Sequence, residues 1–319
     1  MNWKLKANLL VLLERVPAGP AAYSAVQNLR AARSFDADEM LGRALDLLAL
    51  YVEAGGGLPP GRCVEIGTGW CPWLPLLLRL GGASQVLTLD VNPWLSHATA
   101  VATTRELHAR AERTATALGR EPDWVRAQLT PLLSAPSLTA WLEASAIDYL
   151  CPGDARALDL PNASVDAVLS SNVLEHVAAA DLTKLHVEAR RVLRPGGLAV
   201  HRFNPEDHFA PGDSSITGAN FLQFSVPQWR RLGGYGLAPH NRLRCVQHAR
   251  LVEDAGLEVA VSRTRKDERA RLAIESGALP VHHDFAGMSP EQLSDDYMWL
   301  AARAVKPAAE LLDGRVGSS

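Results

Sequence analysis

The sequence predicts an α/β fold in which helices cover both faces of a doubly wound, mostly parallel sheet of seven strands. From residue 62 onward, short apolar stretches typical of strands alternate with stretches typical of helices. The first five predicted strands are separated by helical stretches long enough to connect parallel strands. The chain has 319 residues, of which 47% are hydrophobic, so it can bury a large core. The predicted strands are Arg62–Ile66, Gln85–Asp90, Ile147–Leu150, Val165–Ser170, Leu198–Phe203, Leu257–Ser262 and Met298–Val305.

Residues 1–60 form a predicted N-terminal helical segment that serves as a lid or in dimerisation, so a homodimer is considered. Apolar residues recur at helical spacing over residues 37–53, and the glycines and prolines of residues 55–60 end that helix. The basic start and the run Leu9–Leu13 imitate a signal peptide, but Glu14 and Arg15 interrupt the run. No stretch approaches the ~20 apolar residues of a membrane span. We therefore expect a cytoplasmic protein without a membrane partner.

The remainder, residues 61–306, is predicted to be one Rossmann-like domain with two long insertions. Residues 98–145 are rich in Ala, Leu, Arg and Glu, which predicts extra helices. Residues 204–243 are rich in Gly, Pro, Asn and His and follow the fifth strand, where an active-site lid is expected. Residues 307–319 are expected to form a flexible tail.

Charge and cysteine content restrict the class of partner. The chain has 32 Lys and Arg residues against 35 Asp and Glu residues, a net charge of −3. This balance disfavours nucleic acid, because binding a phosphate backbone requires a basic surface. The four cysteines form no Cys-x-x-Cys pair, so the sequence indicates neither a zinc site nor a disulfide framework.

A glycine turn after the first strand predicts a nucleoside-containing cofactor. Gly67 and Gly69 follow the apolar strand, and Asp90 ends the next strand about 20 residues later, where doubly wound folds bind a ribose. A dinucleotide fingerprint requires a glycine where this chain has Pro72. Glu65 also places a carboxylate where a pyrophosphate would bind. This negative charge favours S-adenosyl-L-methionine, which carries an ammonium group and a sulfonium cation.

Downstream motifs then establish a family resemblance. Asp154-Ala155 precedes Leu-Pro-Asn-Ala-Ser-Val-Asp at 160–166, and Asn-Val-Leu-Glu-His at 172–176 precedes Arg-Pro-Gly-Gly at 194–197. With the glycine turn, this ordered set resembles the class I S-adenosylmethionine-dependent methyltransferases, in particular the bacterial methyltransferase-11/12-like group with an Asn-x-Leu-Glu-His turn. The resemblance covers residues 62–203 and extends weakly to residue 244. It implies the same fold and the same cofactor.

The resemblance also implies which residues bind the cofactor. Glu65, Gly67 and Gly69 would line its methionine part, Asp90 would hold the ribose hydroxyls, and Asn172 would close the site near the methionine end.

The adenine end depends on a second set of residues. Asp154 would accept a hydrogen bond from the adenine amino group, and the backbone N–H of Ala155 would contact the ring. Many relatives have a third glycine where this chain has Cys71. The role of Trp70 is therefore left open between lining the site and packing in the core.

Three histidines are candidates for a general base. His176 follows the fourth strand, His201 lies on the fifth, and His208 begins the lid. Imidazole can accept a proton from an attacking hydroxyl, although each ring could instead orient the backbone. His201, Asp207 and His208 match no ligand spacing of known metal sites, so no metal is predicted.

Candidates for acceptor binding are Arg202, Arg242, Arg244 and Tyr23. The arginines would bind a phosphate or carboxylate of the acceptor, or pair with acids of the lid itself. Tyr23 belongs to an N-terminal segment that relatives often fold over the cofactor.

The sequence thus predicts methyl transfer from S-adenosyl-L-methionine to a small or medium-sized organic acceptor, such as a glycan or natural-product intermediate. The atom that receives the methyl group stays open between oxygen, nitrogen and carbon. One alternative is a non-catalytic subunit that only binds S-adenosylmethionine. Another is a nicotinamide-dependent oxidoreductase, which Pro72 and Glu65 disfavour.

Overall fold

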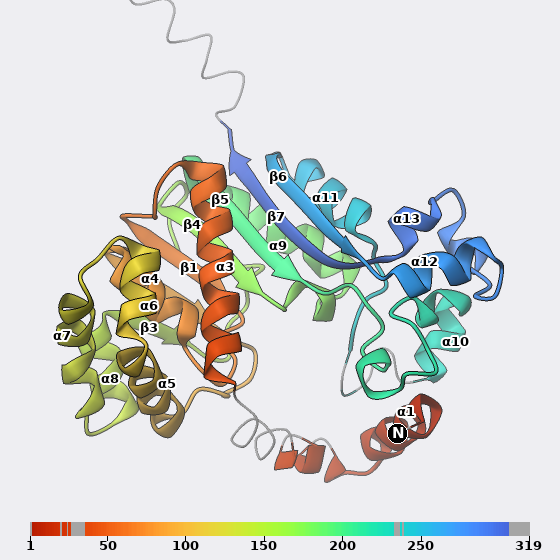
Figure 1. Ribbon diagram of the computed structural model, residues 1–319, viewed down its shortest axis with the longest axis horizontal. Helices are drawn as coiled ribbons and strands as arrows, with labels where there is room; N and C mark the ends of the chain where they lie inside the picture. The colour runs from red at the N-terminus through yellow and green to blue at the C-terminus, as the bar shows by residue number, and fades with distance from the viewer. Residues whose placement is uncertain are drawn as a thin grey trace, which may run out of the picture.

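The computed structural model describes residues 2–19, 21–23, 25–26, 36–232, 237 and 239–305. Seven strands form one sheet in the order β3-β2-β1-β4-β5-β7-β6 (Figure 1). β7 runs antiparallel to β5 and β6, and the other neighbouring strands are parallel. The prediction of a mostly parallel, seven-stranded α/β fold is confirmed. The strands are β1 (Arg62–Ile66), β2 (Gln85–Leu89), β3 (Ile147–Leu150), β4 (Val165–Ser171), β5 (Leu193–Phe203), β6 (Leu257–Lys266) and β7 (Asp295–Ala304).

Strand β5 begins five residues before the predicted position. Residues 194–197, Arg-Pro-Gly-Gly, form an irregularity in the strand, and the register with β4 shifts between Val165 and Ala167. The Arg-Pro-Gly-Gly motif, expected before the fifth strand, is therefore part of β5, because a bulge accommodates extra residues without ending the pairing.

Helices cover both faces of the sheet (Figure 1). On one face, α3 (Ala37–Gly55) packs against β5 and β7, and α4 (Trp73–Gly81) packs against β1 and β2. On the other face lie α9 (Ala179–Val192) and α11 (Cys245–Asp254). Side chains alternate along β5, so Leu198 and Val200 join the core under α3, and Ala199 and Phe203 join the core under α9.

Four helices lie between β2 and β3. They are α5 (His97–Ala109), α6 (Ala111–Leu118), α7 (Pro122–Leu133) and α8 (Leu138–Ser145). Trp141 is fully buried among them and donates a hydrogen bond to Thr104 Oγ1 at 3.0 Å.

A third core lies apart from the two sheet faces (Figure 1, lower right). Trp3, Phe209, Phe221, Trp229 and Phe285 belong to it. The elements involved are α1 (Trp3–Arg15), η2 (Ala210–Gly212), η3 (Asn220–Gln223), α10 (Val226–Arg231), α12 (Glu268–Glu275), η4 (His283–Phe285) and α13 (Pro290–Leu293).

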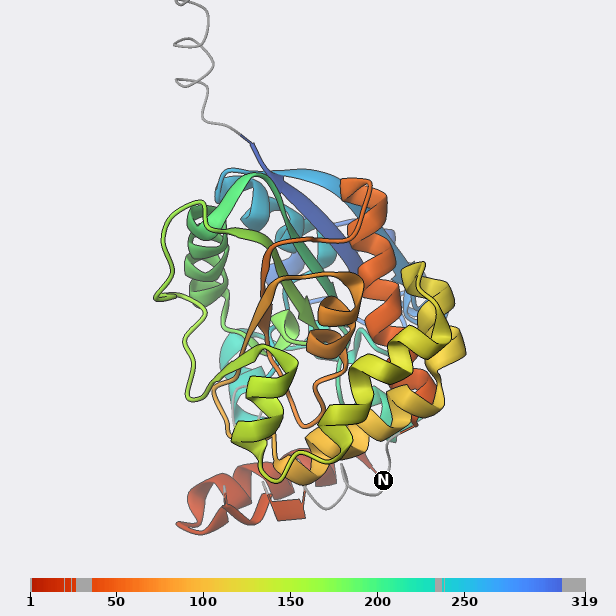
Figure 2. The same cartoon turned by 90° about the vertical axis from the view of Figure 1, so that its left-hand side faces the viewer.

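The expected N-terminal segment, residues 1–60, therefore divides between two cores. Helix α3 packs on the sheet, whereas α1 packs on the segment after β5, where the Trp3 and Phe209 ring centroids are 5.9 Å apart. The two views place α1 at the end of the molecule toward which the parallel strands run (Figures 1 and 2). Among the described residues, no helix combines the length and apolarity needed to cross a membrane. The predicted tail, residues 307–319, lies outside the described residues.

Three buried histidines lie under the sheet on the α9 face. His201 Nδ1 is 2.8 Å from Ser170 Oγ, and the His201 ring lies 5.5 Å from the ring of His186 on α9. His248 on α11 packs against Phe203. Burial lowers the pKa of His186 to about 4 and that of His248 to about 3, and it also lowers the pKa of His201. These rings are therefore neutral in the folded protein.

This cluster predicts a loss of stability in mild acid. Because the folded-state pKa values lie below the ordinary value of 6.5, the unfolded chain binds protons first as the pH falls. Between about pH 7 and pH 4.5, His186 alone contributes a loss of about 2–3 kcal/mol in the free energy of unfolding. Urea unfolding across this range measures the effect. His186→Gln should flatten the pH dependence, and an unchanged profile in that variant would contradict the assignment.

Candidate functional site

The glycine turn after β1 has the geometry of a ligand-binding loop. Gly67 has φ +85° and Gly69 has φ +62°, both in the left-handed region that favours glycine. A Cβ atom on Gly67 would lie 2.3 Å from Val173 Cγ2, so the turn packs directly against the segment after β4. At Gly69, apart from its chain neighbours, no atom of the described residues lies within 4 Å of the position a Cβ would take, so its backbone borders open space that a ligand can approach.

Asp90 lies directly beside this turn. Its Oδ2 accepts a hydrogen bond from Gly69 N at 2.9 Å, and its Oδ1 accepts one from Asn92 N at 3.0 Å. Its backbone N donates to Leu150 O, and its carbonyl accepts from Gly153 N at 2.8 Å. The carboxylate is thereby fixed at the carboxyl end of β2, where the sequence predicts a ribose-binding acid. The fit with a nucleoside cofactor rests on this carboxylate and on the open backbone at Gly69.

Glu65 is a buried acid under the turn. Thr88 Oγ1 donates to its Oε2 at 2.5 Å, and Thr88 is itself 2.5 Å from Thr68 Oγ1. Burial raises the pKa of Glu65 to about 8, against the opposing effect of the Thr88 hydrogen bond. A cation bound nearby would favour the ionised form. This acid therefore suits a cofactor that carries positive charge.

The residues predicted for the adenine end also lie at this edge. Asp154 and Ala155 follow β3 after the turn whose Gly153 bonds to Asp90. Arg156 Nε donates to Asp154 Oδ1 at 2.8 Å, and this bond lowers the pKa of Asp154 to about 2. The carboxylate is half exposed, so it keeps room for a further donor. Its predicted role toward the adenine amino group stays a prediction.

Asn172 joins the ends of three strands. It follows β4 and has φ +56°, a left-handed conformation that is uncommon for a residue other than glycine. Its Nδ2 donates to Asn204 Oδ1 at 2.9 Å, and its Oδ1 accepts from Tyr297 Oη at 3.1 Å. Its backbone N donates to Arg202 O. Sequence reasoning identified Asn172 but missed Asn204 and Tyr297, which hold it.

Trp70 follows the turn and packs against Trp94. Their ring centroids are 4.8 Å apart at an interplanar angle of 34°. Both rings are partly exposed, so this pair lies at the rim of the predicted cofactor region rather than inside the core.

Two of the three candidate histidines meet at the acceptor side of the site. His176 ends η1 (Leu174–His176), directly after β4, and its ring centroid lies 5.0 Å from that of His208. His176 Nδ1 is 2.7 Å from the carbonyl oxygen of Pro239. Glu175, which the sequence did not indicate as a site residue, is buried beside them with one candidate ligand atom within 4.8 Å of each imidazole.

The structure corrects the prediction for His201. Its side chain belongs to the buried cluster with His186, on the face of β5 that α9 covers, and not to the region around His208. Its neighbour Arg202 points to the opposite face, where its Nε lies 3.4 Å from Asp46 Oδ2 on α3. The grouping of His201, Asp207 and His208 weighed for a metal is therefore not assembled, because the His201 side chain lies on the α9 face against Ser170 and His186.

The predicted substrate roles of Arg242 and Arg244 are also revised. Arg244 is fully buried and donates to the carbonyl oxygens of Pro205 and Asp295. Arg242 donates to the carbonyl oxygen of Phe221 at 3.3 Å. Both guanidinium groups thus hold the segment after β5 against its neighbours. Tyr23 packs at the edge of the third core, so its side chain also has a packing role.

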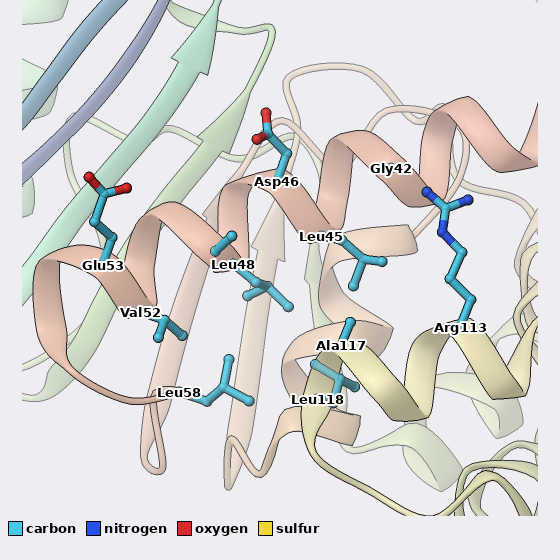
Figure 3. A pocket seen from close by; sticks show the side chains of 11 residues that line it. Gly42, Leu45, Asp46, Leu48, Val52, Glu53, Leu58, Arg113, Ala117 and Leu118 are labelled. Carbon is cyan, nitrogen blue, oxygen red and sulfur yellow. The ribbon is translucent and has the colours of Figure 1, made fainter.

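A groove of about 640 Å³ lies between α3 and α6 (Figure 3). Leu45, Leu48 and Val52 line one wall, and Leu118 lines the other. The groove reaches Leu58, which precedes β1 and so lies toward the amino-terminal edge of the sheet. Its walls are largely aliphatic, with Asp46, Glu53 and Arg113 also lining it, and none of its lining residues belongs to the glycine turn, so we do not assign the cofactor to it.

A family model matches part of the middle of the chain. Residues 133–201 match a family model described as a methyltransferase domain. The match spans β3 to β5 and includes Asn172, Glu175 and His176. It confirms the predicted methyltransferase resemblance, and with it S-adenosylmethionine as the cofactor of this type of domain. No curated protein matches the chain.

Solved structures of similar fold share little sequence. A chain of a Haloferax volcanii complex that contains the Trm112 methyltransferase activator is 17% identical, with 88% of this chain and 97% of that chain covered and a TM-score of 0.45. An S-adenosylmethionine-dependent methyltransferase from Mesorhizobium loti is 19% identical, with 80% and 95% covered and a TM-score of 0.41. The [4+2]-cyclase SpnF is 16% identical, with 82% of each chain covered and a TM-score of 0.44.

The raised pKa of Glu65 predicts that cofactor binding depends on pH. Near pH 7 this carboxyl group is mostly protonated in the free protein, and a bound cation favours its ionisation. Affinity for S-adenosylmethionine should therefore rise with pH up to about 8, by at most about tenfold per unit. Calorimetric titrations at several pH values measure this. The same titrations with Glu65→Gln show how much of the pH dependence comes from ionisation of the ligand itself. If affinity depends on pH in the same way for both proteins, the role of Glu65 is contradicted.

Proposed function

We propose that this chain transfers a methyl group from S-adenosylmethionine to a small or medium-sized organic acceptor bound between the carboxyl edge of the sheet and residues 204–243. The observation that carries the proposal is the carboxylate of Asp90, held at 2.9 Å by the backbone N–H of the left-handed Gly69 at the end of β1. The matched methyltransferase domain supports this reading. The acceptor class, a glycan or natural-product intermediate, remains a proposal from the sequence.

The cofactor half of the site would be provided by the loops after β1, β2 and β3. Asp90 would hold the ribose hydroxyls, Glu65 would face the charged methionine end, and Asp154 and Ala155 would contact the adenine. S-adenosylmethionine supplies a methyl group that its sulfonium already activates. The protein's contribution is then to position the acceptor and to exclude water.

The acceptor half would be provided by η1 and by the segment after β5. Helix α1 covers this segment, with Lys6 Nζ 3.5 Å from the carbonyl oxygen of His208 and Trp3 N bonded to Asp213 Oδ2 at 2.8 Å. These contacts support a lid role for α1 and for the described part of residues 204–243, since both approach the acceptor side. His176 and His208 would lie beside a polar group of the acceptor.

Replacing Asp90 by Ala should weaken binding of S-adenosylmethionine and S-adenosylhomocysteine. Loss of a charged hydrogen-bond acceptor for the ribose costs about 1.5–3 kcal/mol. Calorimetric titration of both ligands measures this loss. Asp148→Asn changes an exposed acid on β3 that bonds to Gln85, so it serves as the matched control and should bind normally.

The alternatives give different outcomes. Protection by NAD(H) in thermal melts, without binding of S-adenosylmethionine by the folded protein, would point to an oxidoreductase. Tight binding without methyl transfer to any compound of a metabolite pool would point to a non-catalytic binding subunit.

A further inference from the structure

We infer that Glu175, His176 and His208 bind a divalent transition-metal ion on the acceptor side of the site. One candidate ligand atom from each side chain lies within 4.8 Å of the other two. Two of the ligands come from η1 after β4, and the third comes from the segment after β5, so the fold brings them together across the carboxyl edge of the sheet.

The His176 imidazole is oriented by a backbone group. His176 Nδ1 lies 2.7 Å from the carbonyl oxygen of Pro239. A ring nitrogen that faces a carbonyl carries the proton, so the other nitrogen keeps its lone pair. His208 Nε2 is buried and has no hydrogen-bond partner among the described residues. His176 has the arrangement of metal-binding histidines, whose second nitrogen donates to a fixed acceptor.

Glu175 gives the second, independent observation. Its side chain is 1% exposed, and its Oε2 has no hydrogen-bond partner within the part of the chain that the structure describes. Its Oε1 accepts a long hydrogen bond, 3.5 Å, from Asn204 N. A buried carboxylate oxygen without a partner is costly, and a bound cation would satisfy it. The nearby Arg202 does not fill this role, since its guanidinium faces Ser171 and Asp46.

The donor set indicates the type of ion. Two imidazole nitrogens and one carboxylate oxygen suit zinc, iron(II), cobalt or manganese, whereas magnesium and calcium favour oxygen ligands. Ligand atoms around such ions lie about 3.3 Å apart, so the three side chains must draw in by about 1 Å. Three protein ligands leave coordination positions open toward the acceptor. If the proposed methyl transfer holds, the acceptor offers an oxygen atom to this ion; binding of the ion itself requires no cofactor.

A second group of possible ligands provides the control. His282, His283 and Asp284 are consecutive residues at the surface, with the His283 side chain 84% exposed. None of the three has a buried side-chain nitrogen or oxygen without a hydrogen-bond partner, so we assign no site to them. Their replacement tests for adventitious binding.

The experiment titrates cobalt(II) into metal-free protein without cofactor and follows visible absorption, with stoichiometry from equilibrium dialysis. We expect one cobalt ion per chain. His176→Ala and His208→Ala should each lower the affinity by at least the ~10–100-fold that changes around metal sites produce. The double variant His282→Ala/His283→Ala should bind cobalt like the wild type.

Two results would overturn the inference: no stoichiometric binding by the wild type, or a loss that follows the His282→Ala/His283→Ala variant instead. His176 is exposed, so its variant should fold even if that of His208 does not, and circular dichroism checks each protein. Titration of S-adenosylmethionine into the same samples separates the two proposals. Failure to bind cobalt with intact cofactor binding removes only the metal site, and the reverse removes only the proposed function.

Discussion

Backbone hydrogen bonds between the loops that leave adjacent strands are the constraint on which the site depends. The amides of Gly67 and Thr68 donate to Leu89 O, Gly153 N donates to Asp90 O, and Asn172 N donates to Arg202 O. These loops after β1, β3 and β4 thus pair backbone amides with a neighbouring strand or loop instead of with water. The polar side chains at these positions are held by the ladder that forms the sheet, and their spacing is fixed before any ligand binds.

Most of the sheet and the cofactor side could be predicted because their signals are local. An apolar strand that ends in Gly67 and Gly69, and a second strand that ends in Asp90, need only strand periodicity and glycine's freedom at positive φ. The acceptor side could not be predicted in the same way. Glu175 and His208 are 33 residues apart, and only the pairing of β4 with β5 brings their loops together. No local sequence pattern shows that Glu175 and His208 lie close together in space.

Two errors have identifiable physical causes. His201 and Arg202 are neighbours in sequence, but successive side chains of a strand point to opposite faces of the sheet. His201 therefore lies on the α9 face, whereas Arg202 lies on the α3 face. Reading the alternation from Ala199 and Phe203 would have placed His201 under α9. Arg244 is expected to bind the acceptor because it is positively charged, but the sequence does not show which groups surround its guanidinium. A guanidinium with five donors can stay buried when backbone carbonyls accept from it, as those of Pro205 and Asp295 do.

The separate core of α1 and the segments after β5 and β6 has an evolutionary consequence. Trp3 packs on Phe209, and Phe209 and Phe221 pack on Trp229 within this unit, whereas the glycine turn and Asp90 belong to the loops after the sheet strands. Mutations that reshape the acceptor side can therefore accumulate in one unit while the cofactor half keeps its stability. A lineage built this way can exchange one acceptor for another in small steps, each of which retains a working donor site.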